Sequence, residues 1–330
     1  MSAPTVEILA VGSELLGHGR QDTNSGELSL RFTREGFHVV RRTIVGDDLP
    51  SLTQAFRDAV QRSSLVISTG GLGPTGDDRT REALAAALDR PLHEEPALLR
   101  TLREKYKAVA RAMPRSNLRQ AQVPRGAVPL ANPEGTAPGL LLDHGVGMVL
   151  VLPGPPAEMR SVLSEEVLQR IRQRLNPPGV AVRVVRTAGM AESELEDRIR
   201  DLYEVCEGTE LTILASPGEV EVRILSRHPD AAVAAERAAD LATTVASRLG
   251  AAVFASEDSS LVAVLGERLR SDGITLAVAE SCTAGMLGEE LTRSPGASDF
   301  FLGGVIAYSD DIKRKVLGVP QATIRQHGAV

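Results

Sequence analysis

Short apolar runs alternate with amphipathic segments along the first half of the chain. The runs at 6–12, 37–45, 65–69 and 146–152 have the length and continuous hydrophobicity of strands that are buried on both faces. Between the second and third runs, residues 48–62 carry apolar side chains at helical spacing. This alternation predicts a parallel sheet covered by helices on both faces, in which ligands bind beyond the carboxyl ends of the strands.

The segment after the first strand fits two structures. Asn24, with Glu27 three residues later, forms a capping box that would open a helix. Leu28, Leu30 and Phe32 also fit the two-residue period of a strand. The capping box favours the helix.

Beyond residue 175 the pattern changes. The Asn-Pro-Pro-Gly sequence at 176–179 indicates a linker. A hairpin at 211–226 and an Ala-rich helix at 230–249 then indicate a small α+β unit, and strands at 274–279 and 300–308 indicate a further α/β unit. We therefore expect an α/β protein in three parts, which are 1–175, 176–256 and 257–330.

Composition and charge narrow the classes of function. Aromatic residues make up only 3% of the chain and Trp is absent, which removes base stacking as a dominant mode of binding. The net charge is −6 over 330 residues, so direct contact with nucleic acid is not expected. The unit at 179–255 resembles an RNA-binding KH module in outline, but it lacks a GxxG loop, and its eight Arg, no Lys and thirteen Asp or Glu give it a net charge of −5. A scaffold or dimerisation role is favoured there.

The cysteines and the apolar runs indicate the compartment. Cys206 and Cys282 are the only cysteines, which excludes a disulfide framework and a four-cysteine zinc site. No basic stretch followed by an apolar stretch begins the chain, and no apolar run is long enough to cross a bilayer. We expect a cytoplasmic protein with no contact with the membrane.

A glycine-rich turn follows the third predicted strand. At Gly70, Gly71 and Gly73 no Cβ blocks the backbone, so N–H groups can point at an anion. Asp77 and Asp78 come directly after the turn and would repel a phosphate unless a cation such as Mg²⁺ lies between them. The alternative is that Asp77 only caps the helix predicted at 78–88.

Other polar residues are expected at the same edge of the sheet. Glu14 follows the first strand, Asp22 and Asn24 open the next helix, and Asp47 and Asp48 follow the second strand. A ring of carboxylates and amides around a glycine turn suits metal-assisted hydrolysis of a diphosphate, in which a carboxylate takes the proton of the attacking water. For any single one of these acids, a solvated helix cap is the alternative.

Six sequence runs together carry a resemblance to a known family. They are GSELL at 12–16, DTNS at 22–25, VGDD at 45–48, TGGLGPTGDD at 69–78, NPEGTAPG at 132–139 and LPGPPAEM at 152–159. In these runs the chain resembles the CinA family, the competence- and damage-inducible proteins of bacteria. The resemblance covers essentially the whole chain and implies that its first part has the molybdopterin-binding fold.

The resemblance also implies an activity and its residues. In CinA proteins the first domain is a metal-dependent ADP-ribose pyrophosphatase. We expect Mg²⁺, Mn²⁺ or Co²⁺ as the divalent ion here, with potassium as a further candidate ion. The family further implies a homodimer and a recombination-protein partner. One departure is Gly76, where relatives often carry a bulkier residue, and this loosens the loop. The residues implied here are Glu14, Asp48, Asp77 and Asp78 as metal ligands, the last three of them also catalytic, and Asn24, Gly70, Gly71, Gly73, Thr75, Asn132 and Glu134 as substrate-binding residues.

A second candidate site lies near the end of the chain. Ser281 stands where a buried strand turns into a helix, so its hydroxyl can act as a nucleophile while helix N–H groups face a developing oxyanion. A serine helix cap is the alternative, and Cys282 is expected to be a packed thiol. The only histidine nearby is His327, so the candidate bases are Tyr308 and Lys313.

This second site also resembles the CinA family. The runs ESCTAG at 280–285 and GGVIAYSDDIK at 303–313 are similar to its nicotinamide-mononucleotide deamidase domain. The resemblance implies Ser281 as nucleophile, Lys313 as base, Tyr308 as an assisting group and Thr283 as a substrate contact, with Ala284 where a glycine is usual. Because the family's domain continues beyond residue 330, we expect an incomplete domain with little or no deamidase activity.

Three functions remain for the whole chain. The first is a hydrolase that cleaves the diphosphate of ADP-ribose or a related nucleotide, with a vestigial deamidase domain of NAD salvage. The second is a molybdopterin-binding protein, because the fold is shared and fold alone does not fix function. The third is a non-enzymatic scaffold for competence and recombination.

Overall fold

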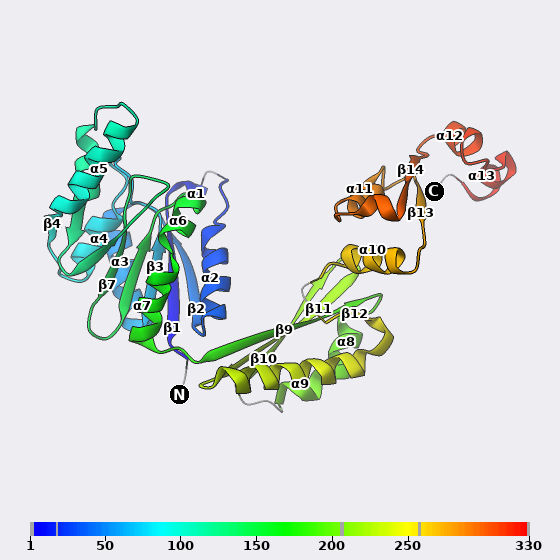
Figure 1. The fold of residues 1–330 in the computed structure, drawn as a ribbon, viewed down its shortest axis with the longest axis horizontal. Helices are drawn as coiled ribbons and strands as arrows, with labels where there is room; N and C mark the ends of the chain where they lie inside the picture. The colour runs from blue at the N-terminus through cyan, green and yellow to red at the C-terminus, as the bar shows by residue number, and fades with distance from the viewer. Residues whose placement is uncertain (1–2, 18, 205–207, 257–258, 329–330) are drawn as a thin grey trace. The chain divides into compact units, whose positions relative to one another are not determined.

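The protein is described by a computed structural model that covers residues 3–17, 19–204, 208–256 and 259–328 (Figure 1). The chain divides into two compact units. The first comprises 1–181 with 226–236, and the second comprises 182–225 with 237–330. No helix among the described residues is long and apolar enough to cross a membrane.

The first unit is built on a six-stranded sheet with the order β2-β1-β3-β8-β7-β6. The four strands β2, β1, β3 and β8 run parallel, as the sequence pattern predicts, whereas β7 runs antiparallel to both of its neighbours. The edge formed by β6 and β7 was not part of the prediction. The strands are β1 (Thr5–Val11), β2 (His38–Val45), β3 (Leu65–Thr69), β6 (Ala127–Leu130), β7 (Gly139–Asp143) and β8 (Met148–Leu152).

Helices cover both faces of this sheet. On one face α2 and α7 pack against Val6 and Ile8 of β1, and on the other face α3 and α4 pack against Leu9 and Val11. Successive side chains of a strand point to opposite faces, so one buried strand contributes to both cores. The helices of the unit are α1 (Glu14–Gly17), α2 (Asn24–Arg34), α3 (Leu49–Arg62), α4 (Thr80–Ala87), α5 (Pro96–Ala108), α6 (Pro156–Val162) and α7 (Glu165–Leu175), with the short strands β4 (Leu92–Glu94) and β5 (Gln122–Pro124) and the 3₁₀ helix η1 (Arg115–Ala121) beside them.

The ambiguous segment after β1 is a helix. Leu28 and Phe32, four residues apart on α2, are fully buried in the core. The expected capping box is wrong, because the side chain of Asp22 caps this end and accepts the N–H of Ser25 at 2.9 Å. Asn24 is thereby free for a contact across the sheet, described below.

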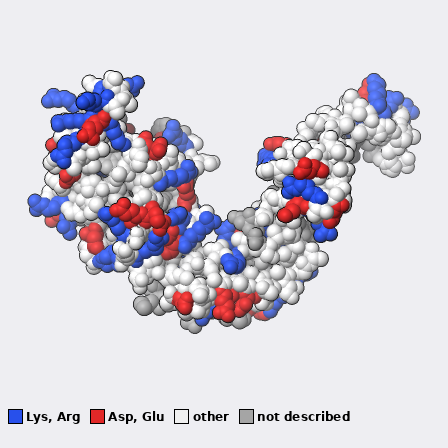
Figure 2. Space-filling view, in the orientation of Figure 1, with Lys and Arg blue, Asp and Glu red and all other residues white. Residues whose placement is uncertain are grey.

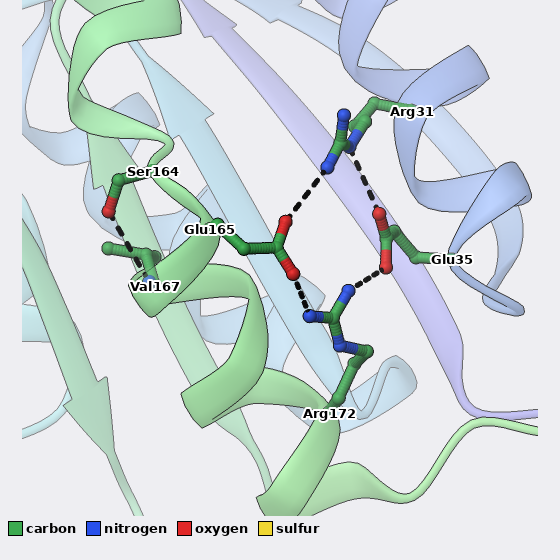
Figure 3. Close-up of polar contacts among 6 residues, drawn as sticks. All are labelled: Arg31, Glu35, Ser164, Glu165, Val167 and Arg172. Atoms are coloured by element: carbon green, nitrogen blue, oxygen red, sulfur yellow. Dashed lines mark hydrogen bonds and ion pairs between the residues drawn. The ribbon is translucent and has the colours of Figure 1, made fainter.

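A closed ring of ion pairs joins α2 to α7 (Figure 3). Arg31 pairs with Glu35 at 3.0 Å and with Glu165 at 3.5 Å, and Arg172 pairs with both of the same carboxylates. Each carboxylate therefore lies between two guanidinium groups. The helix α7, which carries Glu165 and Arg172 of this ring, has Ser164 as its N-cap and Asn176 as its C-cap. Asn176 has a left-handed backbone (φ 45°) and leads into the Pro-Pro-Gly segment predicted as a linker.

We expect Arg172→Met to lower the free energy of unfolding by about 0.5–1 kcal/mol, because a partly exposed network of ion pairs contributes little more than that. Urea titration followed by circular dichroism measures the change. Arg170→Met on the same helix is the matched control, because the ion pair that Arg170 forms among the described residues is the exposed one with Glu166. An equal loss in both variants would contradict a special contribution from the ring.

Basic side chains gather over α5 (Figure 2). Arg100, Arg103 and Lys107 are exposed there. Lys105 is the exception, because its Nζ donates to the carbonyl oxygens of Asn132 and Gly135. One lysine of a solvated helix thus fixes the loop between β6 and β7.

The middle part of the chain forms a four-stranded sheet with the order β10-β11-β9-β12. The predicted hairpin is confirmed, with Pro217 and Gly218 between its strands, and Gly218 takes the positive φ (85°) that a tight turn requires. Alternate residues of β11 are buried, as its sequence pattern predicts. The elements are β9 (Gly179–Ala188), α8 (Glu192–Ile199), η2 (Arg200–Glu204), β10 (Thr209–Ser216), β11 (Glu219–His228), α9 (Ala231–Leu249), η3 (Gly250–Ala252) and β12 (Val253–Ala255).

The last part of the chain has a two-stranded parallel sheet formed by β13 and β14. A small core of Leu291, Ala297 and Phe300 lies beside it. The elements are α10 (Leu261–Ser271), β13 (Leu276–Glu280), α11 (Met286–Thr292), η4 (Ala297–Asp299), β14 (Phe301–Ile306), α12 (Asp310–Lys315) and α13 (Gln321–His327). The predicted strand-to-helix turn thus follows Glu280.

Candidate functional site

A cavity of about 670 Å³ opens at the carboxyl ends of the parallel strands in the first unit. This is the edge at which α/β sheets bind ligands. The segments that line the cavity follow β1, β2, β3 and β8, and the loop before β7 adds to them. The lining residues are 10–12, 14, 15, 20–24, 47, 69–75, 77, 78, 120, 136, 137, 153–156 and 158.

The glycine turn after β3 is held from one side by α4. The Thr80 hydroxyl donates to the carbonyl of Gly70 at 2.8 Å, the Thr80 N–H donates to that of Gly71 at 3.2 Å, and Arg81 donates to that of Leu72. In a trans peptide the carbonyl and the following N–H point in opposite directions. The N–H groups of Gly71 and Leu72 therefore point away from α4, and no described residue accepts a hydrogen bond from either.

Asp78 closes the same loop from within. Its carboxylate accepts the N–H of Gly73 and the N–H of Thr75, both at 2.8 Å, and the hydroxyl of Thr75. A Cβ on Gly73 would lie 2.4 Å from Asp78 Oδ2, so a side chain at this position would displace the Asp78 carboxylate. Gly73 and Thr75 line the cavity as predicted, but their N–H groups already bind Asp78.

Asp77 lines the cavity and is exposed. The Thr75 hydroxyl, backbone N–H groups and the charge of Arg119 hold the pKa of its carboxyl below its usual value. The alternative in which Asp77 caps the following helix is wrong, because α4 begins at Thr80 and its N-cap is Arg79. Asp77 is therefore an ionised carboxylate at the cavity wall.

Asp47 and Asp48 are adjacent in sequence but have different roles. Asp48 caps α3 and accepts the N–H of Ser51 at 3.0 Å, which lowers the pKa of its carboxyl. It is not among the residues that line the cavity, although the resemblance implied it as a ligand. Asp47 lines the cavity instead, and its carboxylate accepts the N–H of Ser13 at 2.8 Å.

Asn24 links three of the loops around the cavity. Its Nδ2 donates to Thr69 Oγ1 at 2.9 Å and to the carbonyl of Gly154 at 2.7 Å. Because a carbonyl can only accept, these contacts fix the orientation of the amide. Asn24 Oδ1 is left buried, with no hydrogen-bond partner in the described part of the chain.

Asn132 does not line the cavity but contacts Glu158, which does. Its Nδ2 donates to Glu158 Oε2 at 2.6 Å and to the carbonyl of Ala137 at 2.7 Å. Glu158 lines the cavity, whereas Asn132 and the exposed Glu134 do not. Sequence reasoning missed Glu158, although the LPGPPAEM run that contains it was one of the matching segments.

The cavity wall is strongly acidic. Its charged residues are one arginine, Arg20, and six carboxylates, which are Glu14, Asp22, Asp47, Asp77, Asp78 and Glu158. Of these six, Glu14 alone has no hydrogen bond to a described residue. Its carboxylate folds back over the end of β1, where a Cβ on Gly12 would lie 2.5 Å from it. The other five carboxylates each accept at least one hydrogen bond.

The donor set bears on which metal site is feasible. No group of three or more His, Cys, Asp or Glu residues within the described ranges is arranged to hold a metal ion. A dedicated all-protein metal cage is therefore not built among them. Mg²⁺ usually keeps several waters and needs only one or two carboxylates together with substrate phosphates. Two carboxylates of the cavity wall, Glu14 and Asp77, would meet the needs of an ion of that kind if a phosphate ligand supplied the rest.

The second candidate site brings two predicted residues together. Lys313 Nζ donates to Ser281 Oγ at 3.1 Å and to the backbone carbonyl of Tyr308 at 3.2 Å. The phenol of Tyr308 has no such contact, and this residue is 72% exposed. The serine-cap alternative is wrong because Gly285 is the N-cap of α11, and Cys282 is exposed rather than packed.

Glu280 organises the turn that carries Ser281. Its buried carboxylate accepts the N–H groups of Gly285, Leu287 and Gly288 at 2.9–3.1 Å. Burial raises the pKa of Glu280, but hydrogen bonds from the Thr283 hydroxyl and these N–H groups outweigh it and lower the pKa. The N–H groups expected to face an oxyanion are thus occupied, and Thr283 contacts Glu280.

Ala284 adopts a left-handed backbone conformation (φ 50°) in this turn. A non-glycine residue in this conformation lowers the free energy of unfolding by about 1–2 kcal/mol. Glycine avoids this strain but loses more conformational entropy on folding, so the net gain from glycine is smaller. We expect Ala284→Gly to raise the free energy of unfolding of this part by about 0.5–1 kcal/mol, measured by urea titration. In contrast, Ala263→Gly inside α10 should lower it by about 1 kcal/mol. A loss of stability in both variants would contradict strain at Ala284.

Comparison with known protein families identifies the class of domain in each part of the chain. Residues 7–173 match the profile of a probable molybdopterin binding domain, 182–255 that of the damage-inducible protein CinA KH domain, and 258–330 that of the CinA C-terminal domain. A CinA-like protein of Solibacter usitatus is 39% identical over 324 residues, and a putative competence-damage inducible protein of Moorella thermoacetica is 40% identical over 329. Both alignments cover 98% of this chain and 78% of the relative. The chain belongs to the CinA family.

A solved structure resembles the first part of the chain. The CinA protein of Thermoplasma acidophilum, described as having unknown function, is 35% identical with a TM-score of 0.47. The match covers 53% of this chain and 99% of that one.

Proposed function

We propose that the first unit hydrolyses the diphosphate of ADP-ribose or a related nucleotide with the help of a divalent ion. The observation that carries this proposal is the pair of N–H groups on Gly71 and Leu72, which have no acceptor among the described residues. They lie at a cavity whose charged side chains are mostly carboxylates. Backbone N–H groups recognise phosphate oxygens. Six carboxylates against one arginine would repel the same phosphate, unless a cation accompanies it.

The size and lining of the cavity agree with a nucleotide. Its volume of about 670 Å³ lies inside the usual range for small-molecule sites. No aromatic side chain is among the described residues that line it, so the base would be held by hydrogen bonds and aliphatic contacts. Asn24 Oδ1, which lacks a partner, is a candidate acceptor for a hydroxyl or amino group of the ligand.

The residues suggest the following division of work. The turn at 70–73 would anchor the diphosphate through the N–H groups of Gly71 and Leu72, and Asp77 and Glu14 would hold the ion. The ion, when bound, screens the phosphate charge and makes a water easier to deprotonate. Glu14 would take the proton of the attacking water, because its carboxylate lies over the end of β1 and makes no hydrogen bond to a described residue. Water adds to one phosphorus, the bridging P–O bond breaks, and the products are AMP and ribose 5-phosphate.

The test is an assay for AMP with the purified chain and ADP-ribose. Turnover is expected with Mg²⁺, Mn²⁺ or Co²⁺, and EDTA should abolish it. Addition of K⁺ separates a potassium requirement from the divalent one. If none of the three ions supports AMP formation, the proposal fails, and tight binding of molybdopterin without turnover would favour the alternative function.

A second proposal concerns the end of the chain, where the contact at 3.1 Å between Lys313 and Ser281 supports an amide-hydrolysing pair. Ser281 would attack the amide carbon of nicotinamide mononucleotide, and Lys313 would take the hydroxyl proton and pass it to the nitrogen, which leaves as ammonia. Water would then hydrolyse the ester, which releases the carboxylate product and restores Ser281. A lysine must lose its proton to act as a base, which needs a dry environment. Tyr308 is mostly exposed and Lys313 only half-buried, so low turnover is expected.

Release of ammonia from nicotinamide mononucleotide measures this second activity. Ser281→Ala should abolish whatever release the native chain supports. Cys282→Ala is the control, because that side chain has no described contact with Lys313. Release that survives Ser281→Ala would contradict the role of Ser281.

A further inference from the structure

Arg81 is the largest fully buried side chain among the described residues, with 1% of its surface exposed. It is the second residue of α4 and lies under the glycine turn. Its Nη2 donates to the carbonyl of Leu72, while Nε and Nη1 have no acceptor among the described residues. A buried cation with unused donors is unfavourable for folding.

The side chain remains charged in this environment. Burial lowers the pKa of Arg81 to about 10, an effect that the charges of Glu82 and Asp78 oppose and that of Arg119 adds to. At neutral pH the guanidinium is therefore protonated. A cation that costs folding free energy and lies next to a candidate ligand site suggests a role in binding.

Arg81 lies on the side of the turn that carries the carbonyl groups, opposite the N–H groups of Gly71 and Leu72. The peptide between Leu72 and Gly73 presents its carbonyl to Arg81 and its N–H to Asp78, so these two side chains together fix the peptide. The neighbouring N–H of Leu72 points away from α4 and has no acceptor among the described residues. The Leu72 carbonyl has a second, neutral donor in Gln120 Nε2, at 3.4 Å. Loss of the arginine would then remove the charge and weaken the hold on this peptide without leaving the carbonyl unpaired.

We propose that Arg81 is a positioning residue of the phosphate cradle, which orients the Leu72 carbonyl and supplies a buried positive charge behind the turn that receives the diphosphate. The inference rests on the function proposed above. A fixed charge in a poorly solvated place acts on a bound anion more strongly than a surface charge does. Such a charge is also screened little by salt.

The test compares Arg81→Met and Arg81→Lys with the native chain. Met fills a similar volume without charge, and Lys keeps the charge with a single donor group. Calorimetry measures the dissociation constant for inorganic pyrophosphate with Mg²⁺, in low and in high salt, and urea titration measures stability. Arg57→Met is the matched control, because Arg57 also donates to one carbonyl, that of Ala86, but on the exposed surface.

We expect Arg81→Met to bind pyrophosphate at least tenfold more weakly at both salt concentrations, with stability equal to or above that of the native chain. Arg81→Lys should recover part of the affinity, and Arg57→Met should change neither quantity. Native affinity in Arg81→Met would overturn this inference and leave the proposed function standing. A joint loss of stability and affinity in Arg81→Met, without recovery in Arg81→Lys, would assign Arg81 a purely structural role. A native chain that does not bind pyrophosphate would overturn both proposals.

Discussion

Asp78→Ala is expected to reduce turnover of ADP-ribose by at least a hundredfold, which corresponds to about 2.7 kcal/mol of transition-state free energy. The physical reason is the loop between β3 and α4. Asp78 binds the N–H groups of Gly73 and Thr75, and without it both lose their acceptor and the loop opens. The fold should persist, because Asp78 belongs to neither core of the sheet and Leu72 is the one residue of this loop that does.

Asp78→Asn separates two ways in which the carboxylate can act. The amide keeps the shape and one acceptor, so it should restore part of the activity if Asp78 acts by closing the loop. If its charge is needed, for example next to a metal ion, the Asn and Ala variants should be equally inactive. Asp58→Ala on α3 is the control, because Asp58 is partly exposed and its hydrogen bond among the described residues comes from Gln54 on the same helix. Native kinetics in Asp78→Ala would remove Asp78 from the site.

The location of the candidate site could be predicted from the sequence. Parallel strands all end at one edge of a sheet, so the residues that follow them gather there whatever their detailed orientation. For this reason Glu14, Asn24, Gly71 and Asp77 all line the cavity. The strands themselves could be recognised because short, continuous apolar runs bounded by turn residues are typical of fully buried strands.

The orientation of individual side chains could not be predicted in this way. Asp47 and Asp48 both follow β2 directly, and only the start of α3 decides that Asp48 becomes the cap while Asp47 faces the cavity. Glu158 lines the site itself and is held there by a hydrogen bond from Asn132, which is 26 residues away in the sequence. A local pattern contains no information about such a pair.

Arg81 shows a related limit of sequence reasoning. In an amphipathic helix an arginine is expected on the solvated face, because charged residues are seldom fully buried. Here the turn at 70–73 lies over the first residues of α4, and its carbonyls take the donors of Thr80 and Arg81. The burial of Arg81 thus depends on a contact between two elements, which no periodicity reveals.

Gly71→Ala is the second change from which a large loss is expected. Gly71 has a left-handed backbone (φ 66°), and a Cβ there would lie 2.2 Å from Thr80 Oγ1. That hydroxyl is buried and already bonded to the carbonyl of Gly70, so it cannot move freely. The turn must shift instead, which reorients the N–H groups of Gly71 and Leu72. We expect the dissociation constant for magnesium pyrophosphate to rise at least a hundredfold, and stability to fall by about 1–2 kcal/mol.

Two further variants make this prediction specific. In Gly76→Ala the new Cβ has no neighbour within 4 Å and no positive φ opposes it, so affinity should stay native in the same loop. In the double variant Gly71→Ala with Thr80→Ala, the clashing hydroxyl is absent. The loss of binding free energy in the double variant should therefore be smaller than the sum of the losses in the two single variants. Purely additive losses would mean that the contact with Thr80 is not what excludes a side chain at position 71. Native affinity in Gly71→Ala alone would mean that the backbone of the turn does not bind the phosphate.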